Sequence, residues 1–194
     1  PQPDLMSALV EAEDQGDKLT EQELISTCIL LLVAGHETTT NLIGNGMLAL
    51  LRNPDQLAKL KAQPALGRSA IEELLRYDSP VQMTSRMVLH ETEYNGQLLR
   101  RGMQVSFMLG AANHDPEVFE RPEIFDIRRS PNPHLSFGGG VHYCIGAPLA
   151  RLEAQVAFGA LLRRFESLNL ADDAICWRPL VNLRGLQTLA VCSA

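Results

Sequence analysis

Several patterns that would point to a class of protein are missing from this sequence of 194 residues. Lys and Arg, 17 in all, are outnumbered by 23 Asp and Glu. The net charge of −6 argues against a nucleic-acid partner, because phosphate binding needs clustered cations. The longest apolar run, residues 28–34, is far shorter than the roughly 20 residues that a membrane span needs. We therefore expect neither nucleic acid nor a membrane as a partner.

Cysteine is scarce as well, and its spacing excludes two further classes. Cys28, Cys144, Cys176 and Cys192 form no C-x-x-C pair and no recurring framework, so neither a zinc site nor a disulfide scaffold is indicated. No secretory signal is visible, and we expect a cytoplasmic, reducing location. With 45% hydrophobic and 21% charged residues, the composition is that of a globular protein able to bury a core.

Helical patterns occupy most of the chain. Residues 20 to about 51 are predicted to form the longest helix, opened by a capping box of Thr20 and Glu23. This helix is apolar nearly all round up to Ala34, so we expect that part to lie in the protein interior. Asn53-Pro54 is expected to end it and to start the next helix.

Two more helices and a minor β part complete the prediction. A second capping box, Ser69 with Glu72, opens a helix that stops before Pro80, and another helix spans about 148–165. Between them, Asn95-Gly96 and Arg101-Gly102 indicate tight turns among short strands in residues 82–109. Residues 113–133 are typical of an ordered irregular segment, and strands recur around 181 and 189–192. The fold class is mainly α with a minor β part.

The segment FGGGVHYCIG, residues 137–146, places four glycines around Cys144 just before a predicted helix. Glycine allows positive φ and a close approach of backbone N–H groups to the sulfur. The positive end of the following helix lowers the pKa of a thiol. A stabilised thiolate in such a loop is either a nucleophile or a metal ligand. The alternative is a glycine-rich turn with a buried structural cysteine.

The segment AGHETT, residues 34–39, interrupts the apolar helix. Burying a carboxylate and two hydroxyls there costs free energy unless they are paired or functional. Gly35 weakens the helix, and a Thr hydroxyl can bond back to an earlier carbonyl and open the turn into a groove. A zinc-protease helix would need a second His four residues after His36, where Thr40 stands. A structural polar notch remains the alternative.

The pattern F-G-x-G-x-H-x-C-x-G around Cys144 resembles the haem-binding signature of the cytochrome P-450 family. The resemblance implies that Cys144 is the axial thiolate on the iron of haem b. It also implies that His142 meets a haem propionate and that Phe137 lies against the cysteine ligand, with Gly138 in the cofactor-binding loop.

The pattern A-G-x-E-T-T is similar to the oxygen-activation motif of the same family. By that likeness Glu37 and Thr38 would be catalytic and would manage protons and water on the distal side of the haem. Ala34 and Gly35 would line the distal haem face.

Two further motifs follow the family's order. Glu73 and Arg76 match its E-x-x-R helix, in which the pair is buried and structural and ties the helix to the irregular segment. From spacing alone such a pair would more often be exposed and weak. Arg86 matches a residue that pairs with the other propionate, a role that suits a guanidinium. An exposed strand arginine is the alternative reading of Arg86.

The irregular segment departs from the family at two positions. Many relatives have Arg where His114 and Ile124 stand, and the second of these usually completes a triad with the E-x-x-R pair. The missing partner is therefore expected to come from elsewhere in the chain, where His114 and Arg121 are nearby in sequence, or to be absent.

The resemblance covers almost the whole chain and fits the bacterial soluble branch. It implies the C-terminal, haem-binding portion, residues 1–194, of a single haem-thiolate monooxygenase domain whose N-terminal portion is absent. The implied activity is hydroxylation of an apolar small molecule with O₂ and externally supplied electrons. An inactive haem-binding remnant, or a haem-free structural fragment, is the alternative.

The partners follow from that activity. A ferredoxin or flavoprotein would supply electrons on the cysteine side, where Arg128, Arg129 and Arg151 are candidate contacts, although each alone is more typical of a solvated charged surface. An apolar organic substrate is the expected ligand. The missing N-terminal half, or a second copy of the chain, is a further expected partner.

Overall fold

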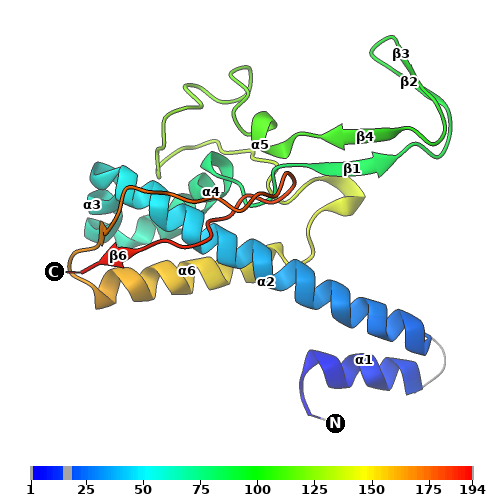
Figure 1. Ribbon diagram of the computed structural model, residues 1–194, viewed down its shortest axis with the longest axis horizontal. Coiled ribbons are helices and arrows are strands. Elements are labelled where there is room, and N and C mark those ends of the chain that lie inside the picture. Colours follow the sequence, from blue (N-terminus) through cyan, green and yellow to red (C-terminus); the bar gives the residue numbers. More distant parts are fainter. Residues whose placement is uncertain (1, 15–18, 194) are drawn as a thin grey trace. The chain divides into compact units, whose positions relative to one another are not determined.

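The computed structural model describes residues 2–14 and 19–193 (Figure 1). Pro1, residues 15–18 and Ala194 lie outside the described residues. The chain divides into two compact units, residues 1–37 and 38–194. Among the described residues, no helix is long and apolar enough to cross a membrane.

The first unit holds helix α1 (Leu5–Asp14) and the first portion of helix α2 (Glu21–Arg52). The predicted capping box is confirmed. The Glu23 N–H donates to Thr20 Oγ1 at 3.3 Å, and the Thr20 N–H donates to the Glu23 carboxylate at 2.8 Å. This bond holds the pKa of Glu23 below its usual value.

The expectation that this portion of α2 lies in the interior is wrong for the described chain. Leu30, Leu32 and Val33 are 64%, 72% and 61% exposed. A helix that is apolar all round needs cover on every side. Among the described residues of its unit, the short helix α1 is the only other helix, so most of this surface has no cover.

The second unit has its core where the rest of α2 meets helices α3 (Pro54–Ala62), α4 (Gly67–Tyr77) and α6 (Ala147–Arg164) (Figure 1). Gly46 of α2 makes this packing close, since a Cβ there would lie 2.7 Å from Phe158 of α6 and 3.0 Å from Leu74 of α4. The predicted break at Asn53-Pro54 is confirmed, because α2 ends at Arg52 and Pro54 opens α3.

The second predicted capping box is wrong. Helix α4 follows the 3-10 turn η1 (Pro64–Leu66) and begins at Gly67, so Ser69 lies inside its first turn. The Ser69 hydroxyl donates to the Leu66 carbonyl at 3.0 Å, and Glu72 binds partners from elsewhere in the chain. A side chain with stronger tertiary partners does not reach back to its own helix end.

The minor β part agrees with the sequence prediction. Strand β1 (Thr84–Met87) pairs antiparallel with β4 (Gln104–Phe107), and β2 (Thr92–Tyr94) pairs with β3 (Gln97–Leu99). Asn95 and Gly96 join β2 to β3 with φ of 48° and 75°, as a tight hairpin turn requires. Short β5 (Asn169–Leu170) pairs with β6 (Val191–Cys192), whereas Val181 lies in no strand.

Helix α5 (Leu109–Ala112) leads into the irregular segment. This segment contains no helix or strand up to the 3-10 turn η2 (Gly140–His142). The predicted irregular character of residues 113–133 is therefore confirmed. Because a segment without a ladder must bond its backbone elsewhere, the side chains that hold it matter for the site.

Candidate functional site

The loop of residues 137–146 folds as a tight turn, here called the Cys144 loop. Gly138 and Gly140 have φ of +70° and +60°, a region that favours glycine. The Cys144 N–H donates to the Phe137 carbonyl at 2.9 Å and closes the loop. Helix α6 starts at Ala147, whose N–H donates to the Cys144 carbonyl at 3.2 Å. The sulfur therefore lies on a rigid turn at the positive end of a long helix.

Cys144 is exposed in the described chain, so the alternative of a buried structural cysteine is wrong. Its neighbours Val141 and Ile145 are 97% and 90% exposed, and a Cβ added at Gly139 or Gly140 would have no described residue other than its chain neighbours within 4 Å. Exposed apolar side chains around a cysteine fit a large apolar group that carries a metal.

The donor set also fits such a group. In the part of the chain that the structure describes, no three His, Cys, Asp or Glu side chains gather as a metal site. A single thiolate is the donor that a metal already held by a macrocycle takes from a protein.

The segment before the loop is fixed to α4 by two buried side chains that the sequence did not single out. Asn113 accepts the Leu135 N–H at 2.7 Å and donates to the Ser136 hydroxyl at 2.9 Å. That hydroxyl donates to the Leu75 carbonyl of α4 at 2.7 Å. Short polar side chains in an irregular segment were the only available signal, and they have many other uses.

Glu73 and Arg76 form a fully buried pair on α4, as the family resemblance implies. Arg76 Nε and Nη2 donate to the two Glu73 oxygens at 2.8 and 2.9 Å, and both side chains are 0% exposed. Arg76 also donates to the carbonyls of Asn113 and Pro122, each at 2.9 Å. The pair therefore ties α4 to the irregular segment, whereas the exposed reading from spacing alone is wrong.

Arg129 completes the triad, so the expectation of a partner from elsewhere in the chain is confirmed, although neither His114 nor Arg121 is that partner. Arg129 Nε lies 3.2 and 3.1 Å from the two Glu73 oxygens, and its side chain is 11% exposed. The chain turns back because the Asp126 N–H donates to Glu73 at 2.9 Å and the Arg129 N–H to the Asp126 carbonyl at 3.0 Å. This fold-back, rather than nearness in sequence to Ile124, decides the partner.

His114 and Arg121 have other positions. His114 Nδ1 lies 3.1 Å from the Gly110 carbonyl. The Arg121 side chain is 73% exposed and lies 3.6 Å from Glu120.

Glu72, next to Glu73, binds Arg151 of α6 and His134. Arg151 donates to both of its oxygens at 2.7 and 2.9 Å, and His134 Nε2 lies 2.9 Å away. Burial raises the pKa of Glu72, but the hydrogen bonds from Arg151 and His134 outweigh burial and hold the pKa at about 2. The same pair raises the pKa of Arg151 above its ordinary value.

The three arginines suggested as redox-partner contacts now differ. Arg129 and Arg151 are held by Glu73 and Glu72 and are not free surface cations. Arg128 is exposed and donates to Gln63 at 3.0 Å. A contact role stays a prediction for all three arginines, of which Arg128 is the most exposed.

The remaining predicted residues lie on three elements. Arg86 is half-buried on β1 and donates to Thr84 Oγ1 and to the Ser85 carbonyl, at 3.0 and 2.8 Å. His142 is exposed at the end of η2. Their predicted roles at the propionates stay predictions.

The interrupted segment lies on α2, with Ala34, Gly35 and Glu37 in the first unit and Thr38 at the start of the second. The helix assignment is unbroken there, so the predicted opening of the turn is not a break in the helix. Glu37 and Thr38 are half-buried. Their catalytic roles stay predictions.

A model of the family described as "Cytochrome P450" matches residues 1–63 and 65–176. The chain belongs to the cytochrome P450 family. It is 54% identical over 191 residues to the biotin biosynthesis cytochrome P450 of Bacillus subtilis (strain 168), covering 98% of this chain and 48% of that relative. Over 194 residues it is 53% identical to the polyketide biosynthesis cytochrome P450 PksS of the same organism, with the same coverage.

Solved structures agree with this assignment. The P450 monooxygenase TamI with bound tirandamycin C matches with a TM-score of 0.96 at 44% identity, over 100% of this chain and 49% of that one. The chain thus spans about half the length of the relatives it matches. The mainly α fold of the haem-binding portion of a P450 is confirmed, and members of this family bind haem b through a cysteine thiolate.

Proposed function

We propose that residues 1–194 are the haem-binding portion of a P450 monooxygenase that hydroxylates an apolar small molecule. Cys144 would hold the iron of haem b through its thiolate, and the loop that carries it is the observation behind the proposal: an exposed cysteine on a glycine turn closed by the Cys144 N–H bond to the Phe137 carbonyl. Bound haem supplies O₂ activation with externally supplied electrons, which a thiolate ligand favours by donating electron density.

The chain's other residues serve binding and proton handling. His142 and Arg86 would hold the haem propionates, since charge-assisted donors suit carboxylates. Phe137 and Gly138 shape the loop around the ligand. Ala34 and Gly35 would leave room for the haem, and Glu37 and Thr38 would hold water and pass protons beside it.

The partners in this proposal are an electron donor, a ferredoxin or flavoprotein, and an apolar substrate, in the cytoplasm. One matched solved structure is a P450 in complex with an acyl carrier protein ligated to hexadec-9Z-enoic acid, and PksS is a cytochrome P450 of polyketide biosynthesis. Long apolar acyl chains are therefore the first substrates to screen.

The test is the spectrum of the chain after expression with haem, reduction and addition of CO. We expect a thiolate-type red-shifted Soret band that Cys144→Ala abolishes. The matched control is Cys176→Ala, because Cys176 is also an exposed free cysteine and should leave the band unchanged. Haem that binds equally well to Cys144→Ala would overturn the ligand assignment, and no haem uptake by the chain would favour the haem-free structural fragment.

Turnover separates the enzyme from an inactive remnant. Haem-loaded chain is supplied with peroxide, as a surrogate for O₂ and electrons, and with an apolar acyl substrate. Hydroxylated product that depends on Thr38 and Glu37 supports the proposal. Haem bound through Cys144 without product from any apolar substrate would support the remnant.

A further inference from the structure

The Glu72–Arg151 pair reaches the Cys144 loop through an aromatic ring. The Arg151 guanidinium carbon lies 4.5 Å from the centre of the Phe137 ring, within the range of a cation–π contact. Arg151 Nη1 also donates to the Tyr143 hydroxyl at 3.1 Å. One arginine of α6 therefore contacts the residue at the start of the loop and the residue just before Cys144.

Phe137 is surrounded by the same group of side chains. The rings of His134 and Tyr143 lie 6.1 and 6.3 Å from the Phe137 ring, both tilted against it. The Ser136 N–H donates to His134 Nδ1 at 3.3 Å, so in the neutral ring Nε2 carries the proton and donates to Glu72. Glu72 thus orients both side chains, Arg151 and His134, that flank Phe137.

The backbone of Phe137 is hydrogen-bonded to the backbone of Cys144. Its carbonyl accepts the Cys144 N–H at 2.9 Å. Which rotamers a side chain can adopt depends on the φ and ψ of its residue, so a Phe137 ring that is held in one rotamer narrows the backbone conformations open to Phe137 and therefore the direction of that carbonyl. The Arg151 side chain is 28% exposed and makes two hydrogen bonds to Glu72. Because these bonds already fix its rotamer, contact with Phe137 costs little further side-chain entropy.

We propose that Glu72 and Arg151 are positioning residues for Cys144: Glu72 fixes the guanidinium, which fixes Phe137, whose carbonyl sets the cysteine backbone. The proposal deepens the proposed function, on which its haem readout rests, but its first test needs no haem. In this proposal the ion pair of Arg151 with Glu72 of α4 serves the Cys144 loop.

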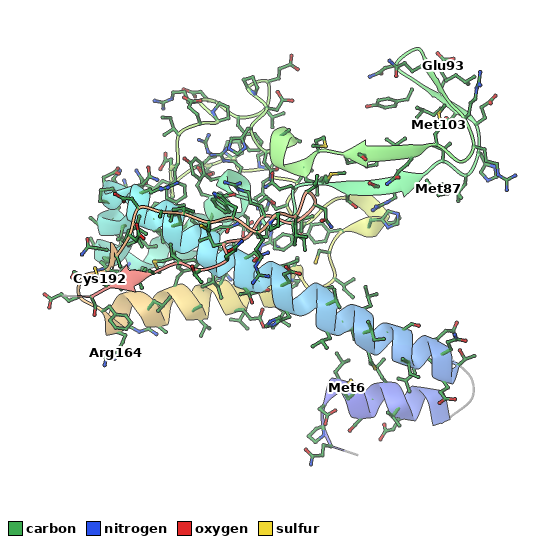
Figure 2. All side chains as sticks on the ribbon, in the orientation of Figure 1. Met6, Met87, Glu93, Met103, Arg164 and Cys192 are labelled. Atoms are coloured by element: carbon green, nitrogen blue, oxygen red, sulfur yellow. The ribbon has the colours of Figure 1, made fainter. Side chains whose placement is uncertain are left out.

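The first test is hydrogen exchange of the Cys144 amide in the haem-free chain. Arg151→Ala should speed exchange of that amide about tenfold, the loss expected for a contact worth one charged hydrogen bond. The matched control is Arg164→Ala. Arg164 stands in the last turn of the same helix, with its guanidinium 5.4 Å from the Phe165 ring, and is labelled in Figure 2. The control should leave Cys144 exchange unchanged.

A double variant separates positioning from simple tethering of α6 to α4. Glu72→Arg with Arg151→Glu restores an ion pair but removes the guanidinium from its place on α6 over Phe137. If Arg151 positions the loop, the double variant keeps slow exchange in α3 and α4 but not at Cys144. Recovery of Cys144 protection, or faster exchange spread evenly over α3, α4 and α6 in Arg151→Ala, would overturn the proposal.

The second test uses the haem-loaded chain. Arg151→Ala and Arg151→Lys should bind haem but show a larger share of the unshifted band after reduction and CO, because the thiolate is less well held. A fully thiolate-type band in both variants would overturn the proposal. Absence of that band in the unsubstituted chain would instead overturn the proposed function, so the two failures are distinguishable.

Discussion

Glu72 and Glu73 are consecutive acids on α4, and each holds an arginine from a distant part of the chain. Glu73 is 0% exposed and binds Arg76 and Arg129, whereas Glu72 is 30% exposed and binds Arg151 and His134. Both pairings fix an irregular segment: the first fixes the segment after α5, and the second contacts the Cys144 loop.

The difference in exposure determines how much stability is lost when each ion pair is broken. A fully buried charge that loses its partner cannot recover its hydration, so breaking such a pair is far more damaging than breaking an exposed one. Water and salt reach the partly exposed pair and weaken it. We therefore expect Glu73 to matter chiefly for folding and Glu72 chiefly for the local order of the loop.

The largest effect is expected from Arg76→Ala. It leaves the Glu73 carboxylate buried with fewer donors and removes the bonds to the Asn113 and Pro122 carbonyls. We expect a loss of about 3–5 kcal/mol in the free energy of unfolding, measured by urea titration. If the variant is too unstable to purify, soluble yield reports the same loss. A variant as stable as the parent would contradict the comparison.

A smaller effect is expected from Arg129→Ala. Arg76 still binds Glu73, but the bonds of Arg129 to Glu73 and to the Glu120 carbonyl are lost. We expect a loss of about 2 kcal/mol in the same titration, in the range of charged hydrogen bonds. Arg121→Ala is the matched control, since Arg121 was the candidate from sequence, and it should change stability by less than about 0.5 kcal/mol.

Glu72→Gln tests the partly exposed pair through pH. The folded pKa of about 2 lies below the ordinary 4.5, so the carboxylate stabilises the fold above about pH 4.5 and loses that effect as the pH falls toward 2. Arg151 and His134 are the charged and titratable groups that bind it. At pH 7 we expect the free energy of unfolding of the parent to exceed that of the variant by about 1–2 kcal/mol, after allowance for solvent screening.

That difference should shrink steadily between pH 4.5 and 2, as followed by urea titrations at a series of pH values. Glu91→Gln, which changes an exposed acid outside this cluster, serves as the control. A difference between parent and Glu72→Gln that stays constant across this range would contradict the pKa of Glu72.

The smallest effect on stability is expected from Arg128→Gln. Arg128 is exposed and donates to Gln63, a contact open to water. We expect a change within about 0.5 kcal/mol in the free energy of unfolding. A reductase assay with the haem-loaded chain then measures whether Arg128 contacts the electron donor. A large loss of stability would show that the contacts of Arg128 stabilise the fold as those of Arg129 do.

The sequence by itself determined the features that a few neighbouring residues decide. The Thr20 cap, the Asn95-Gly96 turn, the break at Pro54 and the glycines of the Cys144 loop all depend on backbone preferences within one turn of chain. The family resemblance added the buried Glu73–Arg76 pair, which spacing alone would have placed in solvent.

Only the tertiary structure decided which charges meet. Arg129 lies 56 residues from Glu73, and Arg151 lies 79 residues from Glu72. Neither separation leaves a local pattern, because the partners come together through the packing of α4 against α6 and the fold-back of the irregular segment. The same holds for exposure: an apolar stretch such as that before Ala34 requires cover, but its own residues do not say what provides it.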